Sequence, residues 1–252
     1  MNWTGFYTLI DRECYRFMRL FRQTVVPPIV TTVLFILIFG YSLGSRIKEI
    51  EGFSYIIFIL PGLIQMGVVM NAYANTSTSL FMARMERSIE NVLAAPLTNF
   101  QIVTSFMLGG LFRGVVVGAT IMLCAMPFVS FPFAHPAMIV IGLASTSILF
   151  GGLGIISGLM AESWDHIATF TNFVITPFVY LGGVFYSIHM LPGFWPKISM
   201  FNPIFYCIDL LRYGFLGIAD APVALSLTVV CGLAILTYAL CVFLFWKGYK
   251  LS

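Results

Sequence analysis

The longest stretches without a charged residue limit this chain more than any other feature of its sequence. Residues 52–83 lack Asp, Glu, Lys and Arg over 32 positions, and residues 114–161 lack them over 48 positions. A helix needs roughly 20 apolar residues to cross a bilayer core, so the second stretch holds parts of two crossings. The chain is 60% hydrophobic and 9% charged, against roughly 45–50% and 25% in soluble domains. These features predict an all-α integral membrane protein.

Charged residues and prolines divide the chain into six predicted transmembrane helices. Pro127, Pro132 and Pro136 place a turn inside the longer uncharged stretch, near residues 128–136. The second predicted helix is polar in its second half, so we expect it to continue beyond the membrane. The predicted spans are residues 25–43, 53–81, 100–127, 137–160, 166–187 and 221–246.

The positions of Lys and Arg predict the orientation of these spans, because short cytoplasmic segments carry an excess of positive charge. With a cytoplasmic N-terminus, internal segments hold eight such residues and external segments hold four. The internal set is Arg12, Arg16, Arg19, Arg22, Arg84, Arg87, Lys247 and Lys250, and the external set is Arg46, Lys48, Lys197 and Arg212. We therefore expect both termini to be cytoplasmic, which agrees with an even number of spans.

Residues 1–24 form an amphipathic segment before the first span. Apolar side chains recur at helical spacing, and arginines lie about half a turn away. The apolar set is Phe6, Ile10, Cys14, Phe17 and Phe21, and the basic set is Arg12, Arg16 and Arg19. Such a helix suits the cytoplasmic membrane interface. It is interpreted either as an anchor that fixes topology or as a helix that also contacts a cytosolic partner, and the two are compatible.

The cytoplasmic loop between the second and third spans contains a second amphipathic segment, residues 84–96. Apolar residues fall on one face of the predicted helix and charged residues point elsewhere, and Pro96 ends it. The apolar face contains Met85, Ile89, Val92 and Leu93, and the charged set is Arg84, Glu86, Arg87 and Glu90. A short helix held between two spans suits the transfer of force from a cytosolic motor. The alternative is a solvated loop helix without a partner.

Residues 188–220 are apolar but too broken by proline to cross the membrane. The piece after Asn202-Pro203 extends only to Gly217, about 15 residues. Asn followed by Pro is a favourable helix start, and Asp209 and Arg212 are spaced to pair on one face. We expect an external re-entrant helix that either closes the outer mouth of a pathway or forms an ordinary extracellular cap.

Arg113 falls near the middle of the third predicted span. A charge there costs roughly 3 kcal/mol or more and tends to face the bundle interior or a wet cavity. Its predicted roles are to line a pathway or bind a lipid headgroup, or else to pair with a structural partner or snorkel to the interface.

Several functional classes are disfavoured by what the sequence lacks. It contains no G-x-x-x-x-G-K-[ST] phosphate loop, so we do not expect this chain to hydrolyse ATP. No H-E-x-x-H or G-x-S-x-G motif occurs, and the five cysteines show no C-x-x-C spacing, so no metal site is expected. The net charge of +3 is too small and dispersed to favour a nucleic-acid partner.

The order of these parts resembles the ABC-2 type permeases, the membrane subunits of ATP-binding cassette transporters. The resemblance covers nearly the whole chain: an interfacial helix, six spans, a Glu-x-x-Leu-x-x-Pro helix after the second span, and an external Asn-Pro segment before the last. It is carried by Arg87, Glu90, Leu93, Pro96, Leu191-Pro192, Asn202-Pro203, Asp209, Arg212 and Gly217. Within the family the chain is most similar to bacterial permeases that export nodulation factors, polysaccharides and drugs.

This resemblance implies a bacterial inner-membrane exporter in which a homodimer, or pseudo-symmetric pair, of permeases binds two separate ATPase subunits. ATP and Mg²⁺ would be held by those subunits, and this chain would bind no cofactor. Residues 25–250 would form the transmembrane domain. The implied ATPase-coupling residues are Arg84, Arg87, Glu90, Leu93 and Pro96, the connecting helix carries Arg12, Arg16 and Arg19, and the external gate contains Pro192, Asn202, Pro203, Asp209, Arg212 and Gly217.

The implied mechanism is alternating access that releases an amphipathic substrate outward, whether a lipid, a glycolipid or polysaccharide, or a drug-like molecule. The main rival is a stand-alone secondary carrier. Carriers usually need intramembrane acids for ion coupling, and no Asp or Glu lies deep in a predicted span. The sequence does not identify the substrate.

Overall fold

The computed structural model describes residues 2–43, 49–130 and 132–250, with the backbone alone for residues 40–43. Its first half contains α1 (Trp3–Arg19), α2 (Phe21–Phe35), the π-helix η1 (Ile36–Leu43), β1 (Glu49–Ile50), β2 (Phe53–Ser54), α3 (Tyr55–Met85), α4 (Ser88–Ala94) and α5 (Asn99–Ala125). Its second half contains α6 (Pro136–Met160), α7 (Trp164–Phe170), the π-helix η2 (Thr171–Ile175), α8 (Thr176–Leu181), the 3-10 helix η3 (Ile188–Met190), α9 (Trp195–Met200), α10 (Pro203–Leu216) and α11 (Val223–Trp246).

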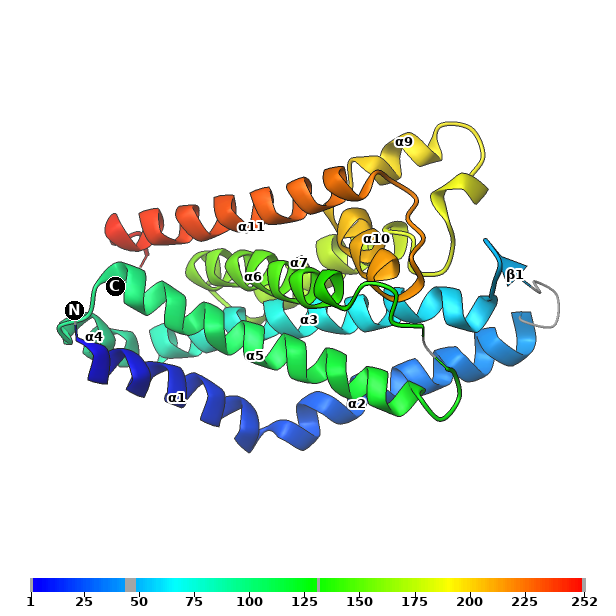
Figure 1. Ribbon diagram of the computed structural model, residues 1–252. Coiled ribbons are helices and arrows are strands. Elements are labelled where there is room, and N and C mark those ends of the chain that lie inside the picture. The colour runs from blue at the N-terminus through cyan, green and yellow to red at the C-terminus, as the bar shows by residue number, and fades with distance from the viewer. Residues whose placement is uncertain (1, 44–48, 131, 251–252) are drawn as a thin grey trace.

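Long helices run side by side along the molecule (Figure 1). Among the described residues, 5 helices are long and apolar enough to cross a membrane: Phe21–Phe39, Tyr55–Met85, Asn99–Ala125, Pro136–Met160 and Val223–Trp246. Their bounds agree with five of the predicted spans to within about one helical turn. The prediction of an all-α integral membrane protein is confirmed.

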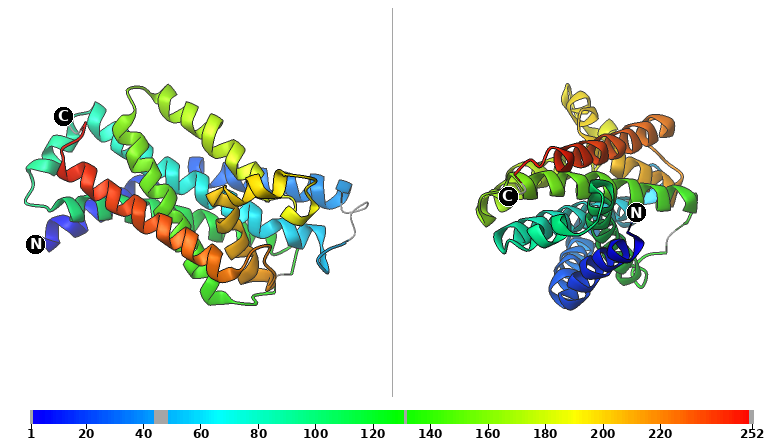
Figure 2. Two further views of the ribbon diagram at one scale, coloured as in Figure 1. Left: turned by 90° about the horizontal axis from the view of Figure 1, so that it is seen from above. Right: turned by 90° about the vertical axis from the view of Figure 1, so that its left-hand side faces the viewer.

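The remaining predicted span, residues 166–187, corresponds to α7, η2 and α8. These three pieces follow one another without a break from Trp164 to Leu181. In the left view of Figure 2 they are the yellow-green helix that leads away from the turn after α6, with α7 in contact with α6 and α8 in contact with α10. This segment is not one of the five helices that meet the length and hydropathy criteria. The count of six spans therefore stays a prediction.

Helix α3 forms the centre of the bundle. Of its most apolar 18-residue stretch, 78% of residues are buried, against 22% for the corresponding stretches of α2 and α11. Helices α5 and α6 pack against α3, and α11 packs on the outer side of α6. Because α2 and α11 leave most of their apolar side chains uncovered, they are the helices most available to lipid.

Glycines let α3 and α6 approach backbone to backbone. A Cβ atom at Gly154 would lie 2.5 Å from the carbonyl oxygen of Tyr73 and would also meet Thr76. One turn further, a Cβ at Gly158 would lie 2.8 Å from the carbonyl oxygen of Ser77. Small residues four positions apart are a recurrent way to pack helices closely in membranes, where dispersion contacts replace the hydrophobic effect as the main attraction.

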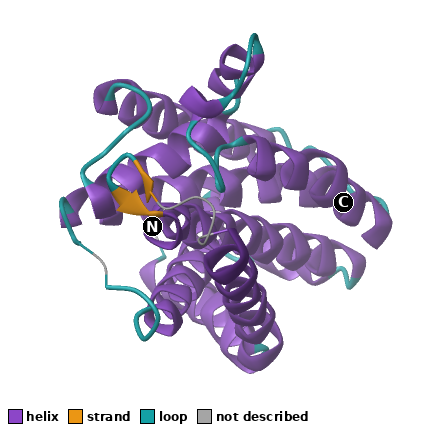
Figure 3. Ribbon diagram, turned by 90° about the vertical axis from the view of Figure 1, so that its right-hand side faces the viewer, coloured by secondary structure: helices purple, strands orange, loops and turns teal. Residues whose placement is uncertain are grey.

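The two ends of the bundle differ in character. The first and last described helices, α1 and α11, begin and end at the side that carries α4 (Figure 1); we call this the terminal end. The opposite end, which we call the far end, carries the antiparallel β1–β2 hairpin and the short helices η3 and α9. Figure 3 views the molecule from that side and shows the strands among loops. The terminal end therefore brings together the start of α1, the end of α11 and α4.

Candidate functional site

The helix predicted over residues 84–96 is divided in two in the structure. Helix α3 continues to Met85, and a turn at Glu86 and Arg87 separates it from α4. Arg87 adopts a left-handed backbone with φ +55°, which stops α3 from continuing. Helix α4 ends at Ala94, two positions before Pro96. The sequence pattern missed this turn because nothing in its periodicity marks a left-handed Arg.

Arg84, predicted to lie on the coupling helix, is instead on the last turn of α3. It donates from Nη1 to the carbonyl oxygens of Gly158 (2.9 Å) and Ala161 (3.1 Å). These carbonyls lie at the C-terminal end of α6, where a cation is favourable. Arg84 therefore joins the end of α3, next to α4, to the end of α6 at the terminal end.

Helix α4 has one buried face and one exposed face. Ile89 and Val92 are buried and hold the helix against the bundle. On its exposed face Leu93 is 39% exposed and Glu90 is exposed, and Met85, the last residue of α3, is 64% exposed beside it. A groove of about 360 Å³ lies beside this face and is lined by Phe81, Arg84, Met85, Arg87, Ile89, Glu90, Ala161 and Glu162. The terminal end thus presents apolar and charged groups on a helix fixed from behind.

Helix α1 packs on α5 through a stripe different from the one predicted. Its buried residues are Leu9, Glu13 and Phe17, whereas Phe6, Ile10 and Cys14 are only partly covered. The reason is Glu13, whose carboxylate accepts hydrogen bonds from Arg12 (3.1 Å), Arg16 (3.3 Å) and Ser79 (2.6 Å). Gly109 of α5 makes room for this, because a Cβ there would lie 2.8 Å from Glu13 Cβ.

Two of the predicted basic residues of α1 therefore face protein. The Arg12 guanidinium lies 5.9 Å from the ring centre of Phe106, within cation–π distance. Arg16 donates from Nη2 to both the carbonyl oxygen (2.9 Å) and Oδ1 (3.0 Å) of Asn75. Arg19 is exposed. Of the three predicted basic residues, Arg16 therefore binds α3, Arg12 contacts α5 with its side chain 42% exposed, and Arg19 stays exposed.

Asn71, Asn75 and Ser79 form a polar ladder on α3, spaced four residues apart on one face. Each rung is bound by a charged side chain from another helix: Ser79 by Glu13 and Asn75 by Arg16. Asn71 is bound by Arg113 of α5, which donates from Nε (3.2 Å) and Nη2 (3.1 Å) to Oδ1. The ladder thus extends from the terminal end toward the middle of the bundle.

The far end contains the predicted non-spanning helix, α10. Asn202 caps it by accepting a hydrogen bond from the Ile204 N–H (3.0 Å), and Pro203 is its first residue. Gly217 ends it with φ +74°, a conformation that suits glycine. The predicted helix start is confirmed. Pro192 lies outside α10, in an exposed turn between η3 and α9.

The expected pair between Asp209 and Arg212 is wrong. Arg212 instead donates to Oδ2 of Asp220 (3.3 Å) and to the carbonyl oxygen of Gly183 (2.6 Å). Asp209 accepts from the Asp220 N–H (2.6 Å) and from Ser226 (2.7 Å). The helical spacing did allow the pair, but the chain after Gly217 folds back and offers both residues closer partners. We call the five residues joined by these hydrogen bonds the far-end network: Gly183, Asp209, Arg212, Asp220 and Ser226.

Comparison with known proteins identifies the family. The family model described as ABC-2 type transporter matches residues 4–216. The chain belongs to the ABC-2 type transporter family. This ABC-2 protein is 41% identical to the inner membrane transport permease YadH of Escherichia coli (strain K12) over 248 residues, which are 98% of this chain and 97% of that protein. It is also 28% identical to nodulation protein J of Sinorhizobium fredii (strain NBRC 101917 / NGR234) over 207 residues, 81% of this chain and 78% of that protein.

Family membership makes this chain the membrane-embedded part of an ABC transporter and gives it an ATP-binding cassette ATPase as a partner in general terms. The matched residues include α4, the polar ladder and α10. The sequence reasoning had found Arg113 and α10 but had missed Glu13, Asn71 and Asn75. One signal was available: a four-residue repeat of polar side chains within an uncharged span indicates a helix face turned toward protein.

Proposed function

We propose that this ABC-2 protein is the permease subunit of an exporter in a bacterial inner membrane, driven by separate ATPase subunits that bind at the terminal end. Two copies of this chain and two ATPase subunits would form the transporter, and ATP with Mg²⁺ would be held by the ATPases. The substrate would be amphipathic and would move outward by alternating access. Family membership favours this function over a stand-alone secondary carrier.

One observation carries the proposal: α4 is rigidly mounted yet exposed. Its buried face is held by Ile89 and Val92, and Arg84 at its base is bonded to the end of α6. Its outer face presents Leu93, which is 39% exposed, and Glu90, which lines the groove. A push on such a helix would be transmitted to α3 and α6 with little local bending, because both helices are joined to its base.

The proposed orientation places the terminal end in the cytosol. Helix α4 shares the terminal end with α1 and with the end of α11 (Figure 1). A cytosolic ATPase can reach α4 only if that end faces the cytosol, which agrees with the excess of Lys and Arg in the predicted internal segments. The name of the relative YadH, an inner membrane transport permease, supports transport at the inner membrane.

The proposal is tested by co-expressing the chain with the ATPase encoded nearest to it and purifying the complex. Leu93→Asp places a charge on the exposed apolar face of α4, and we expect it to lower the amount of co-purified ATPase or its turnover roughly tenfold, as for loss of a central interface residue. Glu90→Ala is expected to lower turnover with less effect on binding.

Phe128→Asp is the matched control, since Phe128 is 50% exposed in the loop after α5, away from α4. It should leave the complex and its turnover unchanged. An intact complex with normal turnover in Leu93→Asp would remove α4 from the coupling interface. A loss in both variants would indicate a general folding defect instead.

A further inference from the structure

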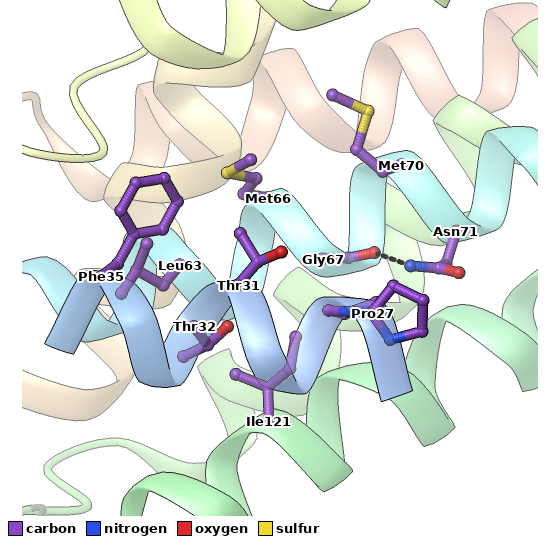
Figure 4. Close-up of a pocket in the computed structure, with 11 residues that line it drawn as sticks. Pro27, Thr31, Thr32, Phe35, Leu63, Met66, Gly67, Met70, Asn71 and Ile121 are labelled. Atoms are coloured by element: carbon purple, nitrogen blue, oxygen red, sulfur yellow. Dashed lines mark hydrogen bonds between the residues drawn. The ribbon is translucent and has the colours of Figure 1, made fainter. Parts of the chain in front are cut away.

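A cavity of about 220 Å³ lies between α2 and α3, with one side formed by α5. It is lined by Pro27, Pro28, Thr31, Thr32, Phe35, Leu63, Met66, Gly67, Met70, Asn71 and Ile121. Figure 4 shows Phe35 and Leu63 toward one end and Asn71 at the other. Because α2 is mostly uncovered by protein, the cavity lies directly behind a lipid-facing helix.

We propose that this cavity, with Arg113 at its Asn71 end, binds one acyl chain of an amphiphile whose anionic headgroup is held by the Arg113 guanidinium. The proposal deepens the function proposed above by naming the chemical class of its ligand. A volume of about 220 Å³ is below the roughly 300–1,000 Å³ of pockets that enclose whole ligands. The cavity therefore suits part of a molecule, such as a chain, with the headgroup outside it.

The charge balance around Arg113 favours an anion. The hydrogen bonds of its guanidinium both go to Oδ1 of Asn71, a neutral group. Arg113 does not take part in any ion pair among the described residues, so no carboxylate lies against its guanidinium there. Glu13, the acid that accepts a hydrogen bond from Ser79 of the ladder, is already shared by Arg12 and Arg16. A partly buried cation in an apolar surrounding is costly unless it is paired.

The position of Asn71 joins the apolar and the charged halves of this site. Its Nδ2 donates to the carbonyl oxygen of Gly67 (3.0 Å), as the dashed line in Figure 4 shows, and its Oδ1 accepts from Arg113. Beyond Asn71 the polar ladder leads toward the terminal end. A chain lying between Phe35 and Met70 would therefore place its headgroup where apolar lining gives way to cations. With the terminal end cytosolic, such a molecule would enter from the cytoplasmic leaflet.

The test measures the binding of phosphatidylglycerol relative to phosphatidylcholine by quenching of a tryptophan with brominated acyl chains. Phe35→Trp provides the reporter in a full-length chain whose four native tryptophans are replaced by Phe. In vesicles that mix the two lipids, we expect the reporter at position 35 to favour phosphatidylglycerol about fivefold, the effect of one cation on an anionic headgroup. Arg113→Gln should reduce the preference to about one, and Arg113→Lys should retain most of it.

Leu236→Trp, on the lipid-facing side of α11 where Leu236 is 62% exposed, is the control reporter. It should show no preference and no response to Arg113→Gln. Equal quenching by both lipids at position 35, or a preference that survives Arg113→Gln, would overturn the proposal. An unchanged size-exclusion profile for Arg113→Gln separates loss of binding from loss of fold.

The anionic amphiphile has two sources, the bilayer itself or a transported cargo, and a second measurement distinguishes them. Vesicles containing the permease and its ATPase are loaded with fluorescent phosphatidylglycerol, and ATP-dependent movement between leaflets is followed. Movement that Arg113→Gln abolishes identifies a cargo site, whereas selective binding without movement identifies a resident lipid site; both uphold the anionic site. The binding measurement uses the permease alone, so its result is independent of whether Leu93→Asp disrupts coupling.

Discussion

Arg212 and Asp220 form a buried ion pair at 3.3 Å, with side chains that are 1% and 0% exposed. The pair joins α10 to the segment that leads into α11, and the same Asp220 carboxylate accepts hydrogen bonds from Ser187 (2.8 Å) and from the Ile188 N–H (3.0 Å). The Arg212 guanidinium also lies 4.1 Å from the ring centre of Phe58. One arginine therefore connects α10, α3 and two far-end loops.

Within the far-end network, removing one partner of the Arg212–Asp220 ion pair should destabilise the fold more than removing both. Asp220→Asn leaves the Arg212 charge buried without its carboxylate, and we expect a loss of about 3–5 kcal/mol in the free energy of unfolding. The double variant Arg212→Met with Asp220→Asn should recover part of that loss, because the Arg212 charge is no longer buried without its Asp220 carboxylate, although the buried Asp209 carboxylate then loses its neighbouring cation. Denaturant titration in detergent measures both values.

The surface pair of Lys250 and Glu162, at 3.4 Å, is the control for that measurement. Glu162→Gln should change stability by less than about 1 kcal/mol, because exposed pairs are weak. If Asp220→Asn were equally mild, the far-end network would not hold α10 in place.

The α3–α6 contact should not tolerate a methyl group. Gly154→Ala would place Cβ 2.5 Å from the Tyr73 carbonyl oxygen, so the two helices must separate, at a cost of about 1–3 kcal/mol. Gly232→Ala is the matched change in α11, where a Cβ meets nothing within 4 Å. It should be neutral or stabilise by up to about 1 kcal/mol through helix propensity. Thermal unfolding in detergent separates the two; similar values for both would refute close packing at Gly154.

Topology should place α4 and α9 on opposite sides of the membrane. Glu86→Cys, in the turn before α4, is expected to react with an impermeant maleimide only when the cytosolic side is open. Lys197→Cys, in α9, should react in intact cells or spheroplasts. Both native side chains are exposed in the fold, so access from a given side decides the result. Labelling of position 86 from the outside would remove the proposed ATPase contact altogether.

The native Cys14 thiol should react slowly with maleimide and accelerate at high pH. Burial raises its pKa above the ordinary value, with a further contribution from the negative charges of Asp11 and Glu13. Only the thiolate reacts, so a raised pKa lowers the reactive fraction at neutral pH and moves the rise in rate to higher pH. The rate is measured against pH with the other four cysteines replaced by Ala.

Tyr15→Cys in a chain that lacks Cys14 provides the comparison, because Tyr15 is 72% exposed. Its rate should rise at a lower pH than that of Cys14. Coincident pH profiles would show that α1 does not rest against the bundle as described.

Much of the fold follows from local sequence signals. The uncharged stretches predicted the long helices to within about a turn, because lipid solvent demands apolar length and little else. Asn202-Pro203 predicted the start of α10 because a cap and a first-turn proline act on adjacent residues. The prediction of one continuous helix over residues 84–96 was wrong at its first turn, because the left-handed backbone of Arg87 separates α3 from α4.

The partners of charged side chains did not follow from the sequence. Arg212 was expected to bind Asp209 at helical spacing but binds Asp220, and Glu13 was treated as part of a surface helix but is buried against Ser79. Periodicity describes one helix at a time. A carboxylate that reaches its partner from another helix depends on how the helices pack, and that packing is set by close contacts such as Gly109 against α1.

The sequence by itself determined that this chain crosses a membrane, approximately where it does so, and that its architecture resembles the ABC-2 permeases. The tertiary structure decided which side of α1 is buried, which charges are paired, and that Arg113 lies beside an apolar cavity, hydrogen-bonded to the Asn71 amide. The physical reason is range: apolar length and helix caps act within a few residues, whereas a buried charge is settled by the side chain that folding brings next to it.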